Sequence, residues 1–299
     1  MYILESHIVK SLQTPTRLEE YCRGLFIQFP SNKSVKKGIK KGAIQLNNKI
    51  IESGRFLNEN DTIQLIELEE SPPKPFPLEI EVVYEDEHLA VVNKPSGLIT
   101  TGNLFRTLEN VIQKQVNISN LKDALKWPKP AHRLDSPTSG LVIISKSISA
   151  HIKLGDMLKN KQITKTYHAI VVGDFPADIS KIDLNISGKI SISKIKKLSS
   201  ERSLRNNYLS LLQLQPLTGR THQLRIHLSE KGFPIAGDIT YSEKGKTLEH
   251  KGLFLSAVQL EFHHPITRGV LNIKIPTPPK FKRLMDREKD RFYKFSKNK

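Results

Sequence analysis

The sequence predicts two α+β domains, a small basic one followed by a larger one with a mainly antiparallel central sheet. Three observations lead to this fold class. The 299 residues correspond to about two domains of ordinary size. Four prolines in residues 69–77 (EESPPKPFP) divide the chain, because such a run forms neither a helix nor a central strand and reads as an extended linker. After this linker, strand-like segments follow one another as hairpins do, without a regular alternation of strand and helix.

The small domain, residues 14–68, is predicted to begin with two short helices. An apolar face at helical spacing follows Thr16, which stands three residues before Glu19, the spacing of a capping box. A second helical stretch follows Ser31, and we expect it to end near Gly42.

The second of these helices is densely cationic. Two strand-like segments with a turn at Asn47–Asn48 follow it and complete a compact module. Five lysines in nine residues, without a compensating acid, favour contact with phosphates over a merely solvated helix face. These lysines are Lys33, Lys36, Lys37, Lys40 and Lys41.

The large domain is expected over residues 78–285, with a basic tail at 286–299 that continues a terminal helix beginning near Pro278. Apolar periodicity predicts each element. We expect helices at 107–116 and 147–160, and strands at 80–84, 89–92, 141–144, 163–172, 207–214, 253–262 and 270–275.

Composition narrows the class of protein. Lys and Arg number 47 against 30 Asp and Glu, a formal charge of +17 that favours nucleic acid as partner over a surface that is basic only for solubility. The single cysteine, Cys22, excludes an intramolecular disulfide and any cysteine-cluster metal site. We read no signal peptide and no apolar run long enough for a membrane span, and therefore expect a cytoplasmic protein.

No motif for a metal or a cofactor is visible. The chain has neither HExxH nor an EF-hand pattern, and neither GxxxxGK[ST] nor GxGxxG. We therefore expect no metal and no cofactor.

Two polar clusters could carry chemistry. In AHRLDSPTSGLVIISKS (131–147), a Pro/Gly-rich turn places Asp135 just before a buried strand, although an Asp that only caps this turn is the simpler interpretation. In PLTGRTHQLRIHLSEKGFPIAGDITY (216–241), Arg220 and Arg225 stand among histidines and apolar residues. Partly buried arginines need carboxylates or phosphates nearby, and Asp135 is the carboxylate we expect one of them to pair with.

Four segments together resemble the RluA-type pseudouridine synthases. They are YEDEHLAVVNKPSGL (84–98), HRLDSPTSGL (132–141), ITKTYHAIVVG (163–173) and the 216–241 cluster, in the order of that family. Residues 14–66 resemble the S4-like RNA-binding domain, a common attachment in this family. The resemblance implies a catalytic domain with a cleft across a mostly antiparallel sheet, an RNA partner and no cofactor.

The resemblance also implies roles for residues. The family's catalytic aspartate falls on Asp135, its base-packing tyrosine on Tyr167, and its aspartate-pairing basic residue on Arg225. Arg133 matches the arginine that helps to displace the target base. We expect substrate contacts from Arg133, His132, Leu134, Leu224, Arg220 and Gln223.

Some positions depart from the family pattern. ITTG (99–102) stands where many members carry a Val-His-Pro-like stretch, Ser256 stands where histidine is frequent, and residues 180–206 show no readable pattern. These departures concern the rim of the cleft.

We expect a monomeric enzyme that isomerises specific uridines in structured RNA, ribosomal rather than transfer RNA. One alternative is a non-catalytic RNA-binding or ribosome-assembly factor, although the motif positions are intact. Another is an RNA glycosidase that uses two carboxylates such as Asp135 and Asp238, which would release free uracil.

Overall fold

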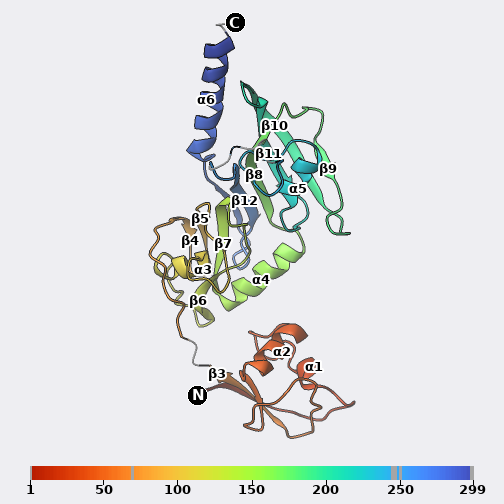
Figure 1. Ribbon diagram of the computed structural model, residues 1–299. Helices are drawn as coiled ribbons and strands as arrows, with labels where there is room; N and C mark the ends of the chain where they lie inside the picture. Colours follow the sequence, from red (N-terminus) through yellow and green to blue (C-terminus); the bar gives the residue numbers. More distant parts are fainter. Residues whose placement is uncertain (1, 69–70, 244–247, 249–250, 297–299) are drawn as a thin grey trace. The chain divides into compact units, whose positions relative to one another are not determined.

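The computed structural model describes residues 2–68, 71–243, 248 and 251–296. The chain divides into two compact units, Met1–Pro72 and Pro73–Lys299, and the division falls inside the proline-rich segment (Figure 1). Each unit has its own hydrophobic core. Within the described residues, no helix combines the length and the apolar character needed to cross a membrane.

The first unit is a three-stranded antiparallel sheet packed on two short helices. Its core includes Leu18, Cys22, Val35 and Ile39, so the expected apolar faces are the buried ones. Its elements are β1 (Tyr2–Ile8), α1 (Leu18–Tyr21), α2 (Asn32–Lys40), β2 (Ile44–Leu46) and β3 (Thr62–Glu67). The sheet order is β1-β3-β2. The edge strand β1 lies before residue 14, where we expected the domain to begin, and it exposes nearly every side chain.

Two local predictions for this unit need correction. Ser31 caps α2 as expected, but Thr16 caps nothing: its hydroxyl donates to the Thr14 carbonyl at 2.9 Å. The cationic face of α2 does have a compensating acid, because Lys36 Nζ lies 3.4 Å from the carboxylate of Glu19 on α1.

The second unit follows the predicted order of elements, with strands added at β6 and in the 180–206 region. In chain order it comprises β4 (Glu81–Glu85), β5 (Leu89–Lys94), α3 (Leu108–Val111), the 3₁₀ turn η1 (Ile112–Lys114), β6 (Ala124–Pro130), β7 (Ser139–Ser147), α4 (Ile148–Lys159), β8 (Thr164–Val172), β9 (Lys181–Asp183), β10 (Ile192–Ser203), β11 (Asn207–Pro216), α5 (Gln223–Glu230), β12 (Leu255–His263), β13 (Val270–Lys274) and α6 (Pro279–Ser296).

Among the described residues, these strands form one ten-stranded sheet with the order β4-β5-β7-β12-β8-β11-β10-β9, to which β6 and β13 add at β7 and β12. The α+β class is confirmed, but the sheet is mixed: β7 and β12 run parallel, pairing Ser139 with Ser256 and Gly140 with Ala257. All other pairs of the named strands in this sheet are antiparallel.

Gly140 permits this parallel contact at the middle of the sheet. Its φ is +113°, and a Cβ there would collide with the backbone of Ala257. Only glycine accepts both the backbone angle and the close approach. Gly140 therefore lets the end of the 131–138 loop lie against β12.

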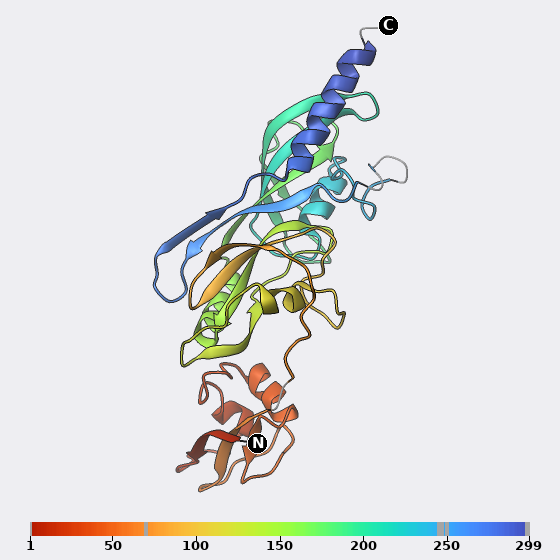
Figure 2. The same cartoon turned by 90° about the vertical axis from the view of Figure 1, so that its left-hand side faces the viewer.

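The C-terminal helix extends into the segment where we expected a basic tail that continues it. α6 continues past residue 286 (Figures 1 and 2). Phe281, Leu284 and Met285, on one side of it, are buried. Beyond that point the buried carboxylate of Glu288 accepts a hydrogen bond from the Ser203 hydroxyl of β10 at 2.8 Å. Packing on β10 explains why this basic segment is part of the fold.

Candidate active site

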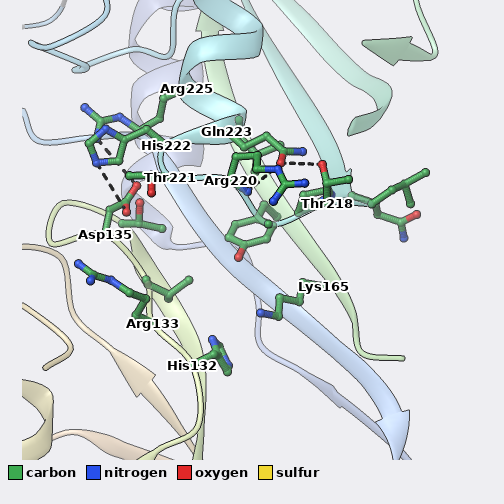
Figure 3. A pocket seen from close by; sticks show the side chains of 18 of the residues that line it. His132, Arg133, Asp135, Lys165, Thr218, Arg220, Thr221, His222, Gln223 and Arg225 are labelled. Carbon is green, nitrogen blue, oxygen red and sulfur yellow. Dashed lines mark hydrogen bonds and ion pairs between the residues drawn. The ribbon is translucent and has the colours of Figure 1, made fainter. Parts of the chain in front are cut away.

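A pocket of about 880 Å³ opens on the second unit (Figure 3). Three segments supply most of its lining: the loop 132–138 before β7, the start of β8, and residues 215–225 at the end of β11 and the start of α5. The lining is completed by Leu158, Lys161, Ile163, Ile192 and Leu255. The two polar clusters singled out in the sequence therefore meet in one cavity.

Asp135 lies on the first of these segments, with its side chain about 24% exposed. The loop that carries it is held on both sides. The hydroxyl of buried Thr100 donates to the Leu134 carbonyl at 2.8 Å and accepts from the Leu134 N–H at 3.1 Å. On the other side, the Ser136 carbonyl accepts from the Gly97 N–H at 2.7 Å. Thr100 belongs to ITTG (99–102), the stretch that differs from the family pattern. In this chain the stretch therefore helps to position the loop that carries Asp135.

Lys94 is a further support that sequence reasoning missed. Its side chain is fully buried, and Nζ donates to the carbonyls of Pro95, Leu98 and Ser136 at 2.7–3.2 Å. Burial lowers the pKa of Lys94 to about 8, although the charge of Asp135 acts in the opposite direction. The signal was available in the sequence as the lysine of the KPSG segment.

Arg225 is bound chiefly to Asp238, a partner we did not expect, and it also lies within ion-pair distance of Asp135, the partner we expected. Nε and Nη2 of Arg225 donate to the two carboxylate oxygens of Asp238 at 2.7 and 2.8 Å, with both side chains buried. Arg225 Nη1 lies 3.9 Å from Asp135 Oδ2, at the limit of an ion pair. Asp238 therefore fixes the guanidinium, and the guanidinium in turn faces Asp135.

Asp238 is fully engaged and is not placed for acid–base work. Its Oδ1 also accepts from the N–H groups of Thr240 and Tyr241 at 3.0 and 3.2 Å. Burial alone would raise the pKa of Asp238, but the hydrogen bonds and charge of Arg225 outweigh it and lower the pKa. The alternative of an RNA glycosidase that uses Asp135 and Asp238 is therefore disfavoured, because the carboxylate of Asp238 is already bound to Arg225.

His222 is a second neighbour of Asp135. It is one of the histidines of the 216–241 cluster, for which the sequence predicted no role. Its Nε2 lies 3.7 Å from Asp135 Oδ1 (Figure 3). Its Nδ1 lies 2.9 Å from the Tyr241 hydroxyl. The residue adopts a left-handed backbone, φ 56°, just before α5, and this turn directs the imidazole towards the loop.

Tyr167 lies on β8, in the wall of the same pocket. Its ring is buried, and burial together with the negative charge of Asp135 raises the pKa of its hydroxyl, so the phenol stays neutral. Leu134 and Leu224, both buried, line the pocket as well. Together they form an apolar surface on which a planar base could pack.

The polar residues expected to contact the substrate differ in exposure and in the partners they already have. Arg133 is exposed at the pocket, and Arg220 also lines it, with Nε donating to the Ile190 carbonyl at 3.2 Å. His132 lines the pocket too, but its Nε2 accepts from the Ile143 N–H at 3.1 Å, and burial lowers its pKa well below the usual range. Its ring is therefore neutral.

Gln223 also lines the pocket, and its side-chain amide already has partners within the protein. Its Oε1 accepts from the Thr218 hydroxyl and the Arg220 N–H, at 2.8 and 3.0 Å, and its Nε2 donates to the Ile192 carbonyl and the Ser193 hydroxyl. The amide is buried and engaged on both sides, so Gln223 stabilises the turn before α5, and its contact with a substrate stays a prediction. Ser256, which stands where the family frequently has histidine, accepts a hydrogen bond from the Ser139 hydroxyl at 3.1 Å, at the point where β7 pairs with β12.

Comparison with known proteins agrees with this geometry. The family described as RNA pseudouridylate synthase matches residues 88–230. The Bacillus subtilis protein named uncharacterized RNA pseudouridine synthase YlyB is 30% identical, over 86% of this chain and 89% of its own. Ribosomal large subunit pseudouridine synthase C of Pasteurella multocida is 31% identical, over 83% and 82%. Dual-specificity RNA pseudouridine synthase RluA of Haemophilus influenzae is 33% identical, over 67% and 93%.

Solved structures add the fold. Human RNA pseudouridylate synthase domain containing 1 superposes with a TM-score of 0.55 at 23% identity, over 71% of this chain and 87% of its own.

Proposed function

This chain belongs to the RluA-type family of RNA pseudouridine synthases, and we propose that it isomerises specific uridines of a structured RNA in the pocket that holds Asp135. One observation carries the proposal: a partly exposed carboxylate on a doubly held loop faces a fixed guanidinium and an apolar wall with a neutral tyrosine.

The reaction breaks the C1′–N1 glycosidic bond of uridine, turns the uracil and rejoins it through C5. It needs neither an electron acceptor nor an energy source. In our proposal Asp135 acts on the ribose, either by attack on C1′ or by removal of a ribose proton. Arg225, which Asp238 holds in place, supplies a fixed positive charge beside the reacting carboxylate.

The uracil must leave the RNA stack to reach Asp135, at a cost of a few kcal/mol. Tyr167, Leu134 and Leu224 would receive the base on their apolar surfaces, which offsets part of this cost. Arg133, exposed at the pocket, is suited to take the place of the displaced base.

We propose that the first unit binds RNA through α2, as an S4-like domain would. Its five lysines are exposed along one short helix and turn, Lys36 with Glu19 beside it. Ribosomal RNA is the favoured target, since the Pasteurella relative is named for the large ribosomal subunit. We further propose a cytoplasmic monomer, in keeping with a single, buried cysteine.

The test is to map pseudouridine across total RNA from cells with and without this protein. We expect one or a few uridines, in ribosomal RNA, to lose the modification when the protein is absent. An unchanged map in every RNA class would refute the proposed function.

A further inference from the structure

Lys165 is a lysine of the pocket that the proposed chemistry does not use. It lies on β8, two residues before Tyr167, and both side chains line the cavity (Figure 3). Alternate residues of a strand point to the same face, so Lys165 stands about 7 Å along the strand from Tyr167. A uracil packed on Tyr167 would therefore have Lys165 near its neighbouring nucleotide.

The side chain of Lys165 is half-buried and unpaired. Within the described part of the chain, no carboxylate lies within ion-pair distance of its Nζ and no hydrogen bond is formed by it. Burial without a partner lowers the pKa of Lys165 to about 8, so it stays mainly protonated at neutral pH. A desolvated cation with no partner is costly, and an arriving anion would relieve that cost.

The side chains that line the pocket carry an excess of positive charge. Among the described residues, its one lining carboxylate is Asp135, and the guanidinium of Arg225, which faces Asp135, is bound to Asp238. The other cationic side chains that line it are Arg133, Lys161, Lys165 and Arg220. Lys161 is exposed in the turn between α4 and β8, four residues before Lys165. The volume of about 880 Å³ is within the range that holds a whole drug-sized ligand, so there is room for more than the uracil.

We propose that Lys165 binds a backbone phosphate next to the target uridine, and so sets the position of the RNA strand relative to Asp135 and Tyr167. This inference rests on the proposed function, because it takes RNA as the ligand. An ammonium suits a phosphate, since it is a compact charge with three donors and no fixed fork. His132 is neutral, so its ring does not repel the ammonium of Lys165.

The test uses the full chain and a short fluorescent RNA with one central uridine among adenosines. Fluorescence anisotropy gives Kd for the unchanged protein, Lys165→Met, Lys165→Arg and the control Lys153→Met, between about 50 and 200 mM salt. Lys153 lies on α4 and is exposed, outside the pocket lining, so its loss reports the effect of net charge alone.

We expect Lys165→Met to weaken binding by about tenfold at low salt, the typical value of a hydrogen bond to a charged group. The slope of log affinity against log salt should become shallower by about 0.7, one phosphate contact on a single strand. Lys165→Arg should keep most of the affinity, and Lys153→Met should change it little. Replacing one phosphate beside the uridine by an uncharged methylphosphonate should cost the unchanged protein affinity and cost Lys165→Met nothing more.

Folding is controlled by thermal unfolding, where Lys165→Met should be as stable as the unchanged protein, because Met removes an unpaired desolvated charge. If slope and affinity are unchanged in Lys165→Met, the phosphate contact does not exist. If they are unchanged while the single-turnover rate at saturating RNA falls, Lys165 acts on the uracil instead, and the inference is overturned. These binding measurements need no turnover, so a failure to find pseudouridine would count against the proposed function without deciding the phosphate contact.

Discussion

Asp238→Asn tests the role assigned to the buried pair of Asp238 and Arg225. The substitution keeps the size of the side chain and one oxygen acceptor, which can still serve the Thr240 N–H. It removes the negative charge and places an amide NH₂ against a guanidinium N–H, so one of the two short hydrogen bonds of 2.7 and 2.8 Å becomes a contact between two donors.

The expected cost follows from burial. Both side chains of the pair are at most 5% exposed, and breaking such a pair from one side costs about 3–5 kcal/mol. Asp135→Asn should cost less than about 1 kcal/mol, because the carboxylate is partly exposed and its contacts with His222 and Arg225, at 3.7 and 3.9 Å, are long. The two aspartates near Arg225 should therefore differ strongly in their contribution to stability.

Equilibrium urea unfolding followed by tryptophan fluorescence measures this difference. The chain has one tryptophan, Trp127 on β6, so the signal reports the second unit. With an m-value of about 2–3 kcal/mol/M, the expected loss of about 3–5 kcal/mol moves the midpoint down by about 1–2.5 M urea. Asp156→Asn, an exposed aspartate on α4, is the matched control and should leave the midpoint in place.

Lowering the pH should reduce the difference in the free energy of unfolding between the unchanged protein and Asp238→Asn. The folded-state pKa of Asp238 is lowered, so its stabilising contribution is present above the ordinary aspartate pKa and is lost as pH falls through the folded value. An unshifted midpoint for Asp238→Asn at neutral pH, or equal losses for Asp238→Asn and Asp135→Asn, would refute the assignment of Asp238 as the partner that holds Arg225.

Three further outcomes are expected. Gly140→Ala should destabilise the second unit by at least about 3 kcal/mol in the same urea assay, since its Cβ would meet the Ala257 backbone; a normal midpoint would contradict the close β7–β12 contact. The free energy of unfolding should rise from about pH 8 to about pH 10, because Lys94 and Lys165 have folded pKa values of about 8 and the unfolded lysines bind more protons over that window; a fall would contradict this sign. Removing residues 1–72 should leave the second unit folded, weaken binding to long RNA and make its salt dependence shallower; an unchanged slope would mean that the α2 lysines do not touch RNA.

Local patterns predicted most of the second unit. The buried strand at 141–144 and the helix at 147–160 are found in β7 and α4, because short apolar runs and capped helices depend on neighbouring residues. The strand β10 was missed, since lysines and serines occupy both of its faces and no alternation marks it. The parallel pairing of β7 with β12 involves two residue pairs far apart in sequence, and no local signal encodes it.

The site was predictable in composition but not in its pairing. Asp135, Tyr167 and Arg225 do meet in one pocket. Both Asp135 and Asp238 could have been the partner of Arg225, and only the fold decides that the buried bidentate contact goes to Asp238. The unpaired state of Lys165 likewise depends on which side chains surround it in three dimensions.

The measurement that tests the central claim most directly compares purified protein with its Asp135→Asn variant on unmodified ribosomal RNA. Pseudouridine formation is read at each uridine, and RNA affinity and the urea midpoint are measured on the same samples. We predict that the variant folds and binds RNA as the unchanged protein does but forms no pseudouridine, because Asp135 acts on the ribose while the basic side chains bind the RNA. Pseudouridine formation by the pure Asn variant at the normal rate would contradict the account.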